Sequence, residues 1–334
     1  MARSARSSSR AARPSSTGSR SSRSRSPSEV PRTAWLFPGQ GAQTVGMGQA
    51  LAEAHPEAAR TFEESNDALG FDLRALCWNG PIEQLDRTIN AQPALLTTSI
   101  AALRSTLAAG LPVDDPLLAG HSLGEFTALV AGGALSLPDA LRLVRRRGEL
   151  MQAADASGGM AAVLGVDATA VEGAIAGSGL VIANDNAPGQ IVISGPLRAF
   201  AAATVALKAA GAKRVLPLRV SGAFHSPEMR AVAPDLARAI AQTPFSALRY
   251  TVIANVDAQP HEHAADFAAL LEQQVYSPVR WTEIVKRAVA EGATTFIEFG
   301  AGNVLTGLVK RIAPEARTAN VSDPSTLAET LALS

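Results

Sequence analysis

The sequence predicts an α/β fold in which a mainly parallel sheet carries helices on its faces and a smaller unit is inserted into the chain. Three observations lead to this prediction. The 334 residues are 47% hydrophobic and 18% charged, enough apolar material for one large core or two unequal domains. Short apolar runs alternate with stretches of helical spacing. Between about residues 155 and 222 the order becomes β-α-β-β-α-β, which is typical of a ferredoxin-like unit.

The first part of the predicted core alternates strands with helices. Thr33–Phe37 is an apolar run that ends at a Pro-Gly-Gln-Gly turn, and Gln49–Leu69 then has helical spacing. The long, largely uncharged stretch Ala91–Leu111 predicts a second helix, and Pro116–Gly120 predicts a short buried strand. Two more helices follow, the second with a proline well placed in its first turn, over about Leu123–Ala134 and Leu137–Ala154.

The rest of the chain predicts the inserted unit and the return to the core. The strands of the unit are expected at Gly158–Val166, Leu180–Ala183, Gln190–Ser194 and Lys213–Leu218, and its helices at Asp167–Ala176 and Pro196–Ala210. Later helices are expected at Pro227–Gln242, Ala264–Val275 and Trp281–Glu291, and later strands at Thr251–Ala254 and Thr294–Phe299. The expected division is a core of residues 33–154 and 223–334 and a subdomain of residues 155–222.

The composition excludes several classes of protein. Cys77 is the sole cysteine, which excludes a disulfide framework and a zinc site built on paired cysteines, and fits a reducing compartment. No uninterrupted apolar run approaches the roughly 18 residues that a membrane helix needs. Of 30 basic and 30 acidic residues, eight arginines and one glutamate lie in residues 1–32, so residues 33–334 carry seven more acids than bases. We therefore expect a cytoplasmic, monomeric core that binds neither membrane nor nucleic acid.

Residues 1–32 have a composition of their own, with eight arginines, twelve serines and the single acid Glu29. So few aliphatic side chains cannot offset the entropy of an ordered chain, and we expect a disordered tail. An organelle transit peptide and a nucleic-acid-binding arm are alternatives. Another is that translation starts near Val30, directly before the first predicted strand. We favour a tail without a role in the core function.

The strongest local signal is the Gly-x-Ser-x-Gly pattern at residues 120–124. It follows a predicted strand and opens a predicted helix, the context in which an α/β-hydrolase-like core exposes a nucleophilic serine. Such a turn would expose Ser122, and the amide of Leu123 at the helix N-terminus would face an oxygen held beside it. An ordinary glycine-flanked turn is the alternative, and the surrounding strand and helix favour the nucleophile.

A nucleophilic serine needs a base, and the chain offers five histidines. His121 neighbours the serine on an extended segment and so points away from it, and we expect it to support the turn from beneath. His225 lies in a loop of small residues just before a predicted helix, where a catalytic base is often carried, and we assign the base to it. The other three are expected on the surface: His55 in a helical context, and His261 and His263 in a polar loop. A metal site at His261 and His263 is disfavoured, because no supporting cluster of ligands accompanies them.

An arginine lies in the middle of an apolar helix face. When residues of the predicted helix Leu137–Ala154 are placed at about 100° intervals, its apolar side chains form a face centred near Arg147. A buried guanidinium is costly unless an anion meets it, and it cannot lose its proton. The anion is either a structural carboxylate such as Glu125 or Asp139, or the carboxylate of a substrate. The planar fork of donors suits a two-oxygen anion of either kind, and both possibilities stay open at this point.

Seven motifs occur in order and span essentially all of residues 33–334. They are Phe37–Gln43 (FPGQGAQ), Gly120–Glu125 (GHSLGE), Arg147–Gln152 (RGELMQ), Asn184–Gln190 (NDNAPGQ), Gly222–Ser226 (GAFHS), Tyr276–Trp281 (YSPVRW) and Glu298–Leu305 (EFGAGNVL). Together they resemble the ordered motifs of the malonyl-CoA:acyl-carrier-protein transacylases, and several motifs in one order are far more specific than any single motif. One departure is Ala301, where the family usually has proline, and we expect no functional consequence.

The resemblance implies a reaction and its residues. A malonyl group would pass from malonyl-CoA to the phosphopantetheine thiol of an acyl carrier protein through a malonyl-serine, in support of fatty acid synthesis. Ser122 and His225 would be nucleophile and base, and the amides of Gln40 and Leu123 the oxyanion hole. A main-chain carbonyl near Gln274 would orient the imidazole in place of an acid. CoA is then a substrate, and no metal or redox cofactor is expected.

The resemblance also bears on specificity and partners. Arg147 would bind the free carboxylate of the malonyl group, and Phe224, before the histidine, would narrow the space for a C2 branch and disfavour methylmalonyl. The carrier protein is expected to be acidic, with Lys208, Lys213 and Arg214 as candidate docking charges.

Other interpretations stay open at this point. Chain order cannot reject a triad acid, because four aspartates lie between the serine and the histidine: Asp139, Asp155, Asp167 and Asp185. A serine hydrolase or thioesterase would use the same turn but release free malonate. A transacylase of a malonate decarboxylase or of a polyketide system would differ only in its partner, and a non-enzymatic scaffold is the outlying hypothesis.

Overall fold

A computed structural model describes residues 1–2, 32–154 and 157–333. The expectations for the tail therefore lie outside the described residues, apart from its two ends. At one of these ends the predicted boundary is wrong, because Arg32 is the first residue of a strand. Its guanidinium donates to the carbonyl of Asp115 and to Oδ2 of the same residue, at 2.9 to 3.1 Å, which fixes the beginning of the strand to the neighbouring loop.

The larger sheet has six strands in the order β10-β9-β1-β2-β7-β8. All neighbours pair in parallel except β7 and β8, which confirms the predicted mainly parallel sheet. The pairing of β1 with β2 sets Phe37 opposite Gly120, so the loops that follow these two strands leave the sheet side by side. The strands are β1 (Arg32–Phe37), β2 (Leu117–Gly120), β7 (Val252–Ile253), β8 (Pro260–His261), β9 (Ala293–Phe299) and β10 (Arg317–Val321).

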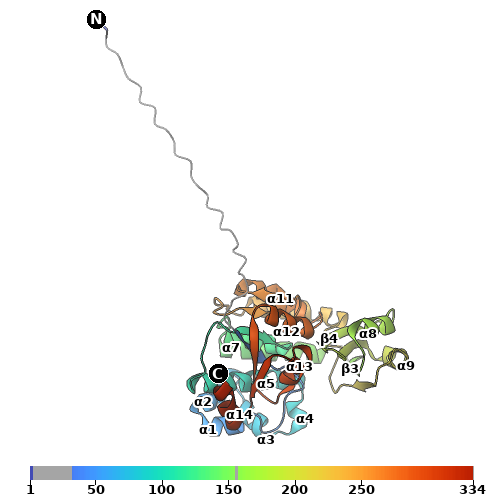
Figure 1. The fold of residues 1–334 in the computed structure, drawn as a ribbon, viewed down its shortest axis with the longest axis horizontal. Helices are drawn as coiled ribbons and strands as arrows, with labels where there is room; N and C mark the ends of the chain where they lie inside the picture. The colour runs from blue at the N-terminus through green and yellow to red at the C-terminus, as the bar shows by residue number, and fades with distance from the viewer. Residues whose placement is uncertain (3–31, 155–156, 334) are drawn as a thin grey trace.

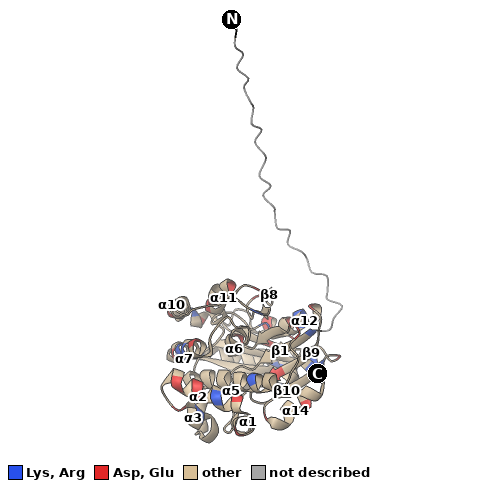
Figure 2. Ribbon diagram, turned by 90° about the vertical axis from the view of Figure 1, so that its left-hand side faces the viewer, with Lys and Arg blue, Asp and Glu red and all other residues tan. Residues whose placement is uncertain are grey.

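Helices cover both faces of this sheet (Figures 1 and 2). Successive side chains of β1 alternate between the faces: Trp35 and Phe37 pack toward α5, α6 and α7, whereas Leu36 packs toward α12 and α13. The α-helices of this core are α1 (Gln49–Ala54), α2 (Pro56–Leu69), α3 (Leu73–Asn79), α4 (Ile82–Leu85), α5 (Thr88–Ala108), α6 (Leu123–Ala131), α7 (Leu137–Ala153), α10 (Ala233–Ala241), α11 (Phe267–Gln274), α12 (Trp281–Ala290), α13 (Val304–Ile312) and α14 (Pro324–Leu333). Short 3₁₀ turns precede α10 and α11, at Pro227–Ala231 and Ala264–Asp266.

The smaller sheet is antiparallel, has the order β4-β5-β3-β6, and lies to one side of the core (Figure 1). Its four strands and two helices follow the β-α-β-β-α-β order that the sequence predicts. Two backbone hydrogen bonds join it to the core. The Asp185 amide donates to the Val279 carbonyl at 3.0 Å, and the Val279 amide donates to the Ala183 carbonyl at 2.8 Å. The elements are β3 (Gly158–Leu164), α8 (Ala168–Ile175), β4 (Val181–Ala187), β5 (Gln190–Pro196), a 3₁₀ turn (Leu197–Ala199), α9 (Phe200–Ala209) and β6 (Arg214–Pro217).

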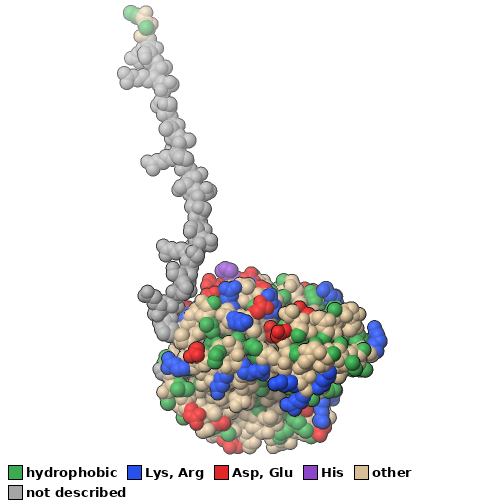
Figure 3. Space-filling model, turned by 45° about the vertical axis from the view of Figure 1, so that its right-hand side comes forward, with side chains coloured by type: hydrophobic (Ala, Val, Ile, Leu, Met, Phe, Trp, Pro, Cys, Tyr) green, Lys and Arg blue, Asp and Glu red, His purple; other side chains and the backbone are tan. Residues whose placement is uncertain are grey.

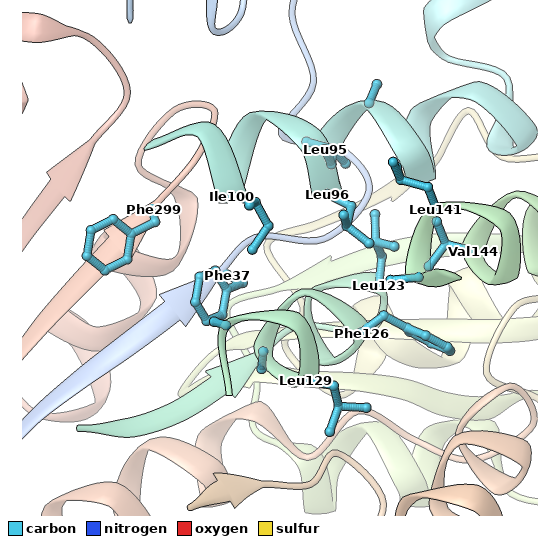
Figure 4. Packing of buried hydrophobic residues seen from close by; sticks show 14 of the residues in the cluster. Phe37, Leu95, Leu96, Ile100, Leu123, Phe126, Leu129, Leu141, Val144 and Phe299 are labelled. Atoms are coloured by element: carbon cyan, nitrogen blue, oxygen red, sulfur yellow. The ribbon is translucent and has the colours of Figure 1, made fainter. Parts of the chain in front are cut away.

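The main hydrophobic core lies between sheet and helices, around α6 (Figure 4). Phe37 from the sheet, Leu96 from α5 and Val144 from α7 are buried about Phe126, which has no exposed surface. Burying a side chain of this size contributes about 1.5–3 kcal/mol. The helix that follows Ser122 is thus surrounded by apolar side chains, and its N-terminus has little freedom to move.

Several predicted boundaries are corrected by local chemistry. The predicted helix 49–69 is two helices, because Pro56 disfavours helical backbone at the preceding residue, and His55 is extended with φ −129°. The predicted helix 123–134 ends at Ala131, before Gly133 with φ 79°. The expected helix 227–242 begins instead with a 3₁₀ turn. Elements that the sequence analysis did not predict are α3, α4, β8, α13, β10 and α14.

A close backbone approach between α6 and the end of β1 carries a prediction. A Cβ added at Gly124 would lie 2.0 Å from the carbonyl oxygen of Phe37, and backbone cannot move away as a flexible side chain could. We expect Gly124→Ala to lower the free energy of unfolding by about 1–3 kcal/mol, the usual cost of overpacking, measured by denaturant unfolding. The matched control is Gly173→Ala in α8, where a Cβ meets nothing within 4 Å. It should be neutral or stabilising, and equal losses in both variants would contradict the steric explanation.

Candidate active site

Ser122 lies at the junction of β2 and α6 in a strained turn. Its φ of 51° and ψ of −104° lie outside the usual regions for a residue with a side chain, and such strain is typical of functional positions. Asn255 braces the turn: its Oδ1 accepts from the Ser122 amide at 2.7 Å, and its Nδ2 donates to the Gly120 carbonyl at 2.7 Å. The turn therefore keeps Ser122 Oγ in a fixed position above the sheet.

The imidazole of His225 receives the serine hydroxyl. Its Nε2 lies 2.7 Å from Ser122 Oγ, and its Nδ1 lies 2.9 Å from the carbonyl oxygen of Gln274 and 3.1 Å from that of Ser277. Since two carbonyl oxygens can only accept, Nδ1 carries the hydrogen and Nε2 presents its lone pair to the serine. Main-chain oxygens thus orient the ring, as the resemblance implies for Gln274.

His225 is held as a neutral base. The residue is 4% exposed and adopts φ 57°, and its own amide donates to the Val275 carbonyl at 3.2 Å. Burial, followed by the charge of nearby Arg147, lowers the pKa of His225 to about 3. The ring is therefore unprotonated across the physiological range and is ready to accept a proton.

Arg147 is 1% exposed and has no carboxylate as a direct partner among the described residues. Its Nη1 donates to Gln92 Oε1 at 2.8 Å, and its Nη2 donates to Gln274 Oε1 at 2.9 Å and to Ser122 Oγ at 3.1 Å. Burial lowers the pKa of Arg147 to about 10, so the group remains charged at neutral pH. Its Nε finds no acceptor in the described structure. The site thus holds a cation with donors to spare directly beside the serine.

The alternative of a structural ion pair at this arginine is not what the described structure shows. Asp139 instead accepts from Ser136 at the beginning of α7 and pairs with Arg142 at 3.0 Å. Glu125 is nearby, but the side chain of Gln274 stands between: its Nε2 donates to Glu125 Oε2 and its Oε1 accepts from Arg147.

Two residues with free main-chain amides, Gln40 and Leu123, line the same cavity as Ser122. The loop after β1 approaches the turn so closely that a Cβ at Gly39 would lie 2.4 Å from the His121 carbonyl oxygen. Neither the Gln40 amide nor the Leu123 amide donates to an acceptor within the described part of the chain, and Leu123, the first residue of α6, has no acceptor within its own helix. The side chain of Gln40 donates a hydrogen bond from Nε2 to Thr88 Oγ1 at 3.3 Å. Two free donors at this place can bind an oxyanion.

The site opens into a cavity of about 510 Å³ between the core and the smaller sheet. Gln40, Leu123, Arg147 and His225 line it from the core. Its other wall includes Met160, Asn184 and the segment Leu218–Val220. A pocket of this volume is in the range of cofactor-sized ligands.

His121 also lines this cavity, but it does not bind the serine. Its Nε2 lies 2.8 Å from Asn186 Oδ1, and its ring packs against Trp281 with centroids 5.5 Å apart. Burial lowers its pKa, so it is neutral. The ring therefore joins the turn to the smaller sheet and supports it from the side.

The remaining sequence candidates lie elsewhere in the described structure. His55 lies between two helices rather than within one, and His261 contacts Asp257 and Asp266 at 3.0 and 3.1 Å. Burial raises the pKa of Cys77 to about 12, which leaves it an inert thiol. Within the described ranges no group of three His, Cys, Asp or Glu could hold a metal ion, and no helix could cross a membrane. Of the possible triad acids, Asp139 accepts from the Ser136 hydroxyl and from Arg142, Asp167 from the Ala170 amide in the first turn of α8, and Asp185 from Thr282, while Asp155 is not described.

Three residues of the site were missed by the sequence analysis as members of it. They are Gln92, Asn255 and Glu125, all fully buried. One signal was available, because Glu125 is the only charged residue in α6, and Gln92 is a polar residue in a helix that is buried along most of its length. Their partners are 55 to 149 residues away in the chain, so their roles depend on the fold.

The arrangement can carry out nucleophilic acyl chemistry. It contains a serine in contact with a neutral histidine, two free amides for a tetrahedral oxyanion, and a buried cation beside the serine.

Comparison with known proteins agrees with this geometry. A model of the acyl transferase domain matches residues 34–326. Similar proteins include the malonyl CoA-acyl carrier protein transacylase of Bacillus subtilis, 46% identical over 89% of this chain and 95% of that protein, and that of Escherichia coli K12, 43% identical over 90% and 99%.

Solved structures show the same relationship. An acyl carrier protein S-malonyltransferase from Vibrio cholerae superimposes with a TM-score of 0.86 at 42% identity, covering 90% of this chain and 99% of that chain. A malonyl-transacylase in complex with a type II PKS acyl-carrier protein gives 0.87 at 40% identity, covering 91% and 100%. These structures share the mixed α/β fold that the sequence predicts. The chain therefore belongs to the acyl transferase domain family.

Proposed function

We propose that the protein transfers a malonyl group from malonyl-CoA to the phosphopantetheine thiol of an acyl carrier protein, in supply of fatty acid synthesis. One observation carries the proposal: Ser122 Oγ contacts both the base and the carboxylate-binding group, at 2.7 Å from His225 Nε2 and 3.1 Å from Arg147 Nη2. Relatives named as malonyl CoA-acyl carrier protein transacylases support this substrate, and a related malonyl-transacylase binds a carrier protein.

The first half-reaction forms the malonyl-enzyme. His225 Nε2 takes the hydroxyl proton as Ser122 Oγ attacks the thioester carbon. The carbonyl oxygen becomes an oxyanion held by the amides of Gln40 and Leu123. When the intermediate collapses, the carbon–sulfur bond breaks and His225 returns the proton to the sulfur of CoA. These steps use side chains and amides of the chain alone.

The second half-reaction repeats these events with a different thiol. The phosphopantetheine thiol of the carrier gives its proton to His225 and attacks the malonyl-serine. The carbon–oxygen bond breaks, and the proton returns from His225 to Ser122. The same ring serves both halves, and it is neutral at the start of each because its surroundings lower its pKa.

Arg147 selects the substrate by its charge. The guanidinium is buried among neutral side chains, so little water screens its attraction for a carboxylate. A bidentate pair with the free malonyl carboxylate would use donors beyond those given to Gln92 and Gln274. Phe224, 4% exposed beside the cavity, limits the space for a branched acyl group.

The carrier protein docks, in this proposal, on the side of the cavity formed by the smaller sheet. Figure 3 brings the right-hand side of Figure 1, where the smaller sheet lies, toward the viewer, and Lys and Arg side chains are spread across the face that it shows. Lys213 and Arg214 are exposed at β6 and suit an acidic partner. Lys208 is less available, since its Nζ donates to the carbonyl of Lys213 at 2.7 Å.

The first prediction concerns the covalent intermediate. Brief exposure to malonyl-CoA should give a malonyl-sized adduct on the wild type, read by intact-protein mass spectrometry, and none on Ser122→Ala. Addition of a phosphopantetheinylated carrier protein should move the adduct to the carrier. Accumulation of free malonate without transfer would instead favour a hydrolase, and no adduct with no turnover would overturn the substrate.

The second prediction concerns the carboxylate. Arg147→Ala should lower kcat/KM for malonyl-CoA by about 10- to 100-fold, because a hydrogen bond to a charged group contributes about 1.5–3 kcal/mol. The loss with acetyl-CoA, which has no free carboxylate, should be smaller. Arg146→Ala is the matched control, because its side chain is exposed and pairs with Glu149 at 3.2 Å. A loss of equal size with both thioesters would show that Arg147 does not read the carboxylate.

A further inference from the structure

One buried carboxylate in the site has no part in the proposed chemistry. Glu125 is fully buried on the first turn of α6, three residues after the nucleophile. Its Oε2 accepts from Gln274 Nε2, and its Oε1 accepts from the Asn255 amide at 3.4 Å. It thus contacts the two residues that hold the base and the serine turn.

Both oxygens of Glu125 face donors. A proton on either oxygen would meet an N–H group, from Gln274 on one side or Asn255 on the other. An amide at this position would have the same conflict, because its NH₂ group would have to point at one of these donors. The surroundings therefore complement an ionised carboxylate.

The carboxylate decides which way the Gln274 amide points. In the observed orientation Nε2 donates to Glu125 and to the Ser122 carbonyl at 2.9 Å, and Oε1 accepts from Arg147. A flipped amide would place its oxygen against two acceptors and its NH₂ group against the guanidinium. Glu125 thereby keeps an acceptor in front of Arg147. The same residue, Gln274, offers its main-chain oxygen to the base.

The second oxygen acts on the serine turn. Glu125 Oε1 accepts from the main-chain amide of Asn255, whose side chain bridges the Ser122 amide and the Gly120 carbonyl. The Glu125 side chain thus contacts both Gln274, which orients the base, and Asn255, which braces the serine turn.

We propose, resting on the proposed function, that Glu125 is a positioning residue whose ionised carboxylate fixes Gln274 and Asn255 and so holds Arg147, His225 and Ser122 in their reactive arrangement. It touches none of the reacting atoms. Its effect passes through the amide of Gln274 and the brace of Asn255.

The charges around Glu125 support a role for its ionisation. Burial, with a smaller contribution from the charge of Asp257, raises the pKa of Glu125 to about 7 against the lowering effects of Gln274, Asn255 and Arg147. Of the other titratable groups in the site, His225 and His121 are neutral there. The ionised form is therefore present above about pH 7 and is lost as the pH falls below it. The His225 base, with its pKa near 3, contributes no titration in this range.

The test compares Glu125→Gln with the wild type in the rate of Ser122 malonylation across pH 5–8.5. The wild-type rate should fall as the pH drops through about 7. The variant should be about 10- to 100-fold slower at pH 8, since one unsatisfied buried donor costs about 1–3 kcal/mol, and its acid limb should be absent. Glu298→Gln is the matched control: Glu298 is also fully buried, but it accepts from the Leu305 and Thr306 amides, and the variant should keep the wild-type pH profile.

A variant that fails to fold would leave the wild-type profile as the deciding measurement. A flat wild-type rate from pH 8.5 to 5, with circular dichroism unchanged, overturns the proposal. So does a folded Glu125→Gln protein with the wild-type rate and profile. If the wild type forms no malonyl-serine at any pH, the proposed function itself has failed, and the two failures are thereby distinguished.

Discussion

The buried charge of Arg147 is the constraint on which the rest of the site depends. A guanidinium that is 1% exposed and stays protonated at neutral pH needs acceptors around it, and Gln92, Gln274 and Ser122 each supply an oxygen. Its charge also disfavours a second cation nearby, which helps to keep His225 neutral. One cation thus keeps the base unprotonated and prepares the pocket for an anion. The separation of Glu125 from this cation by the Gln274 amide leaves the charge only partly compensated, so an incoming carboxylate can still be attracted.

The second constraint is the backbone. Parallel pairing of β1 with β2 sets Phe37 opposite Gly120, and the tight approach at Gly39 and Gly124 brings two loops together. Gln40 and Leu123, far apart in the chain, line the same cavity for this reason. Strain at Ser122 is supported by the Asn255 brace and by the apolar packing of α6. The proposed oxyanion site is therefore a product of sheet register, and side chains need only keep it in place.

Sequence patterns located the groups whose local context is distinctive. The serine turn follows an apolar run and precedes a helix, and the helical period placed Arg147 within an apolar face of α7, where the structure has it. Patterns were weak for β10, which has only five residues, and for α14, which is buried at only two of its ten residues. The apolar period of α13 is clear, with Leu305, Leu308 and Val309 buried on one face, and the sequence analysis did not use it. The roles of Gln92, Asn255 and Glu125 were missed because a polar residue in an apolar segment indicates burial but not its partner, and these partners lie 55 to 149 residues away in the chain.

The contact between Arg147 and Ser122 has a consequence for the order of events. In the free protein Arg147 Nη2 donates to Ser122 Oγ, and this leaves the hydroxyl hydrogen to point at His225 Nε2. The cation thus favours the developing negative charge on the oxygen at the same time as the base removes the proton. A malonyl carboxylate that binds the guanidinium brings its thioester to the oxygen that the same group has just oriented. Alignment of the nucleophile therefore precedes binding of the acid, and a substrate without the carboxylate meets an aligned serine but lacks the attraction that brings its thioester to it.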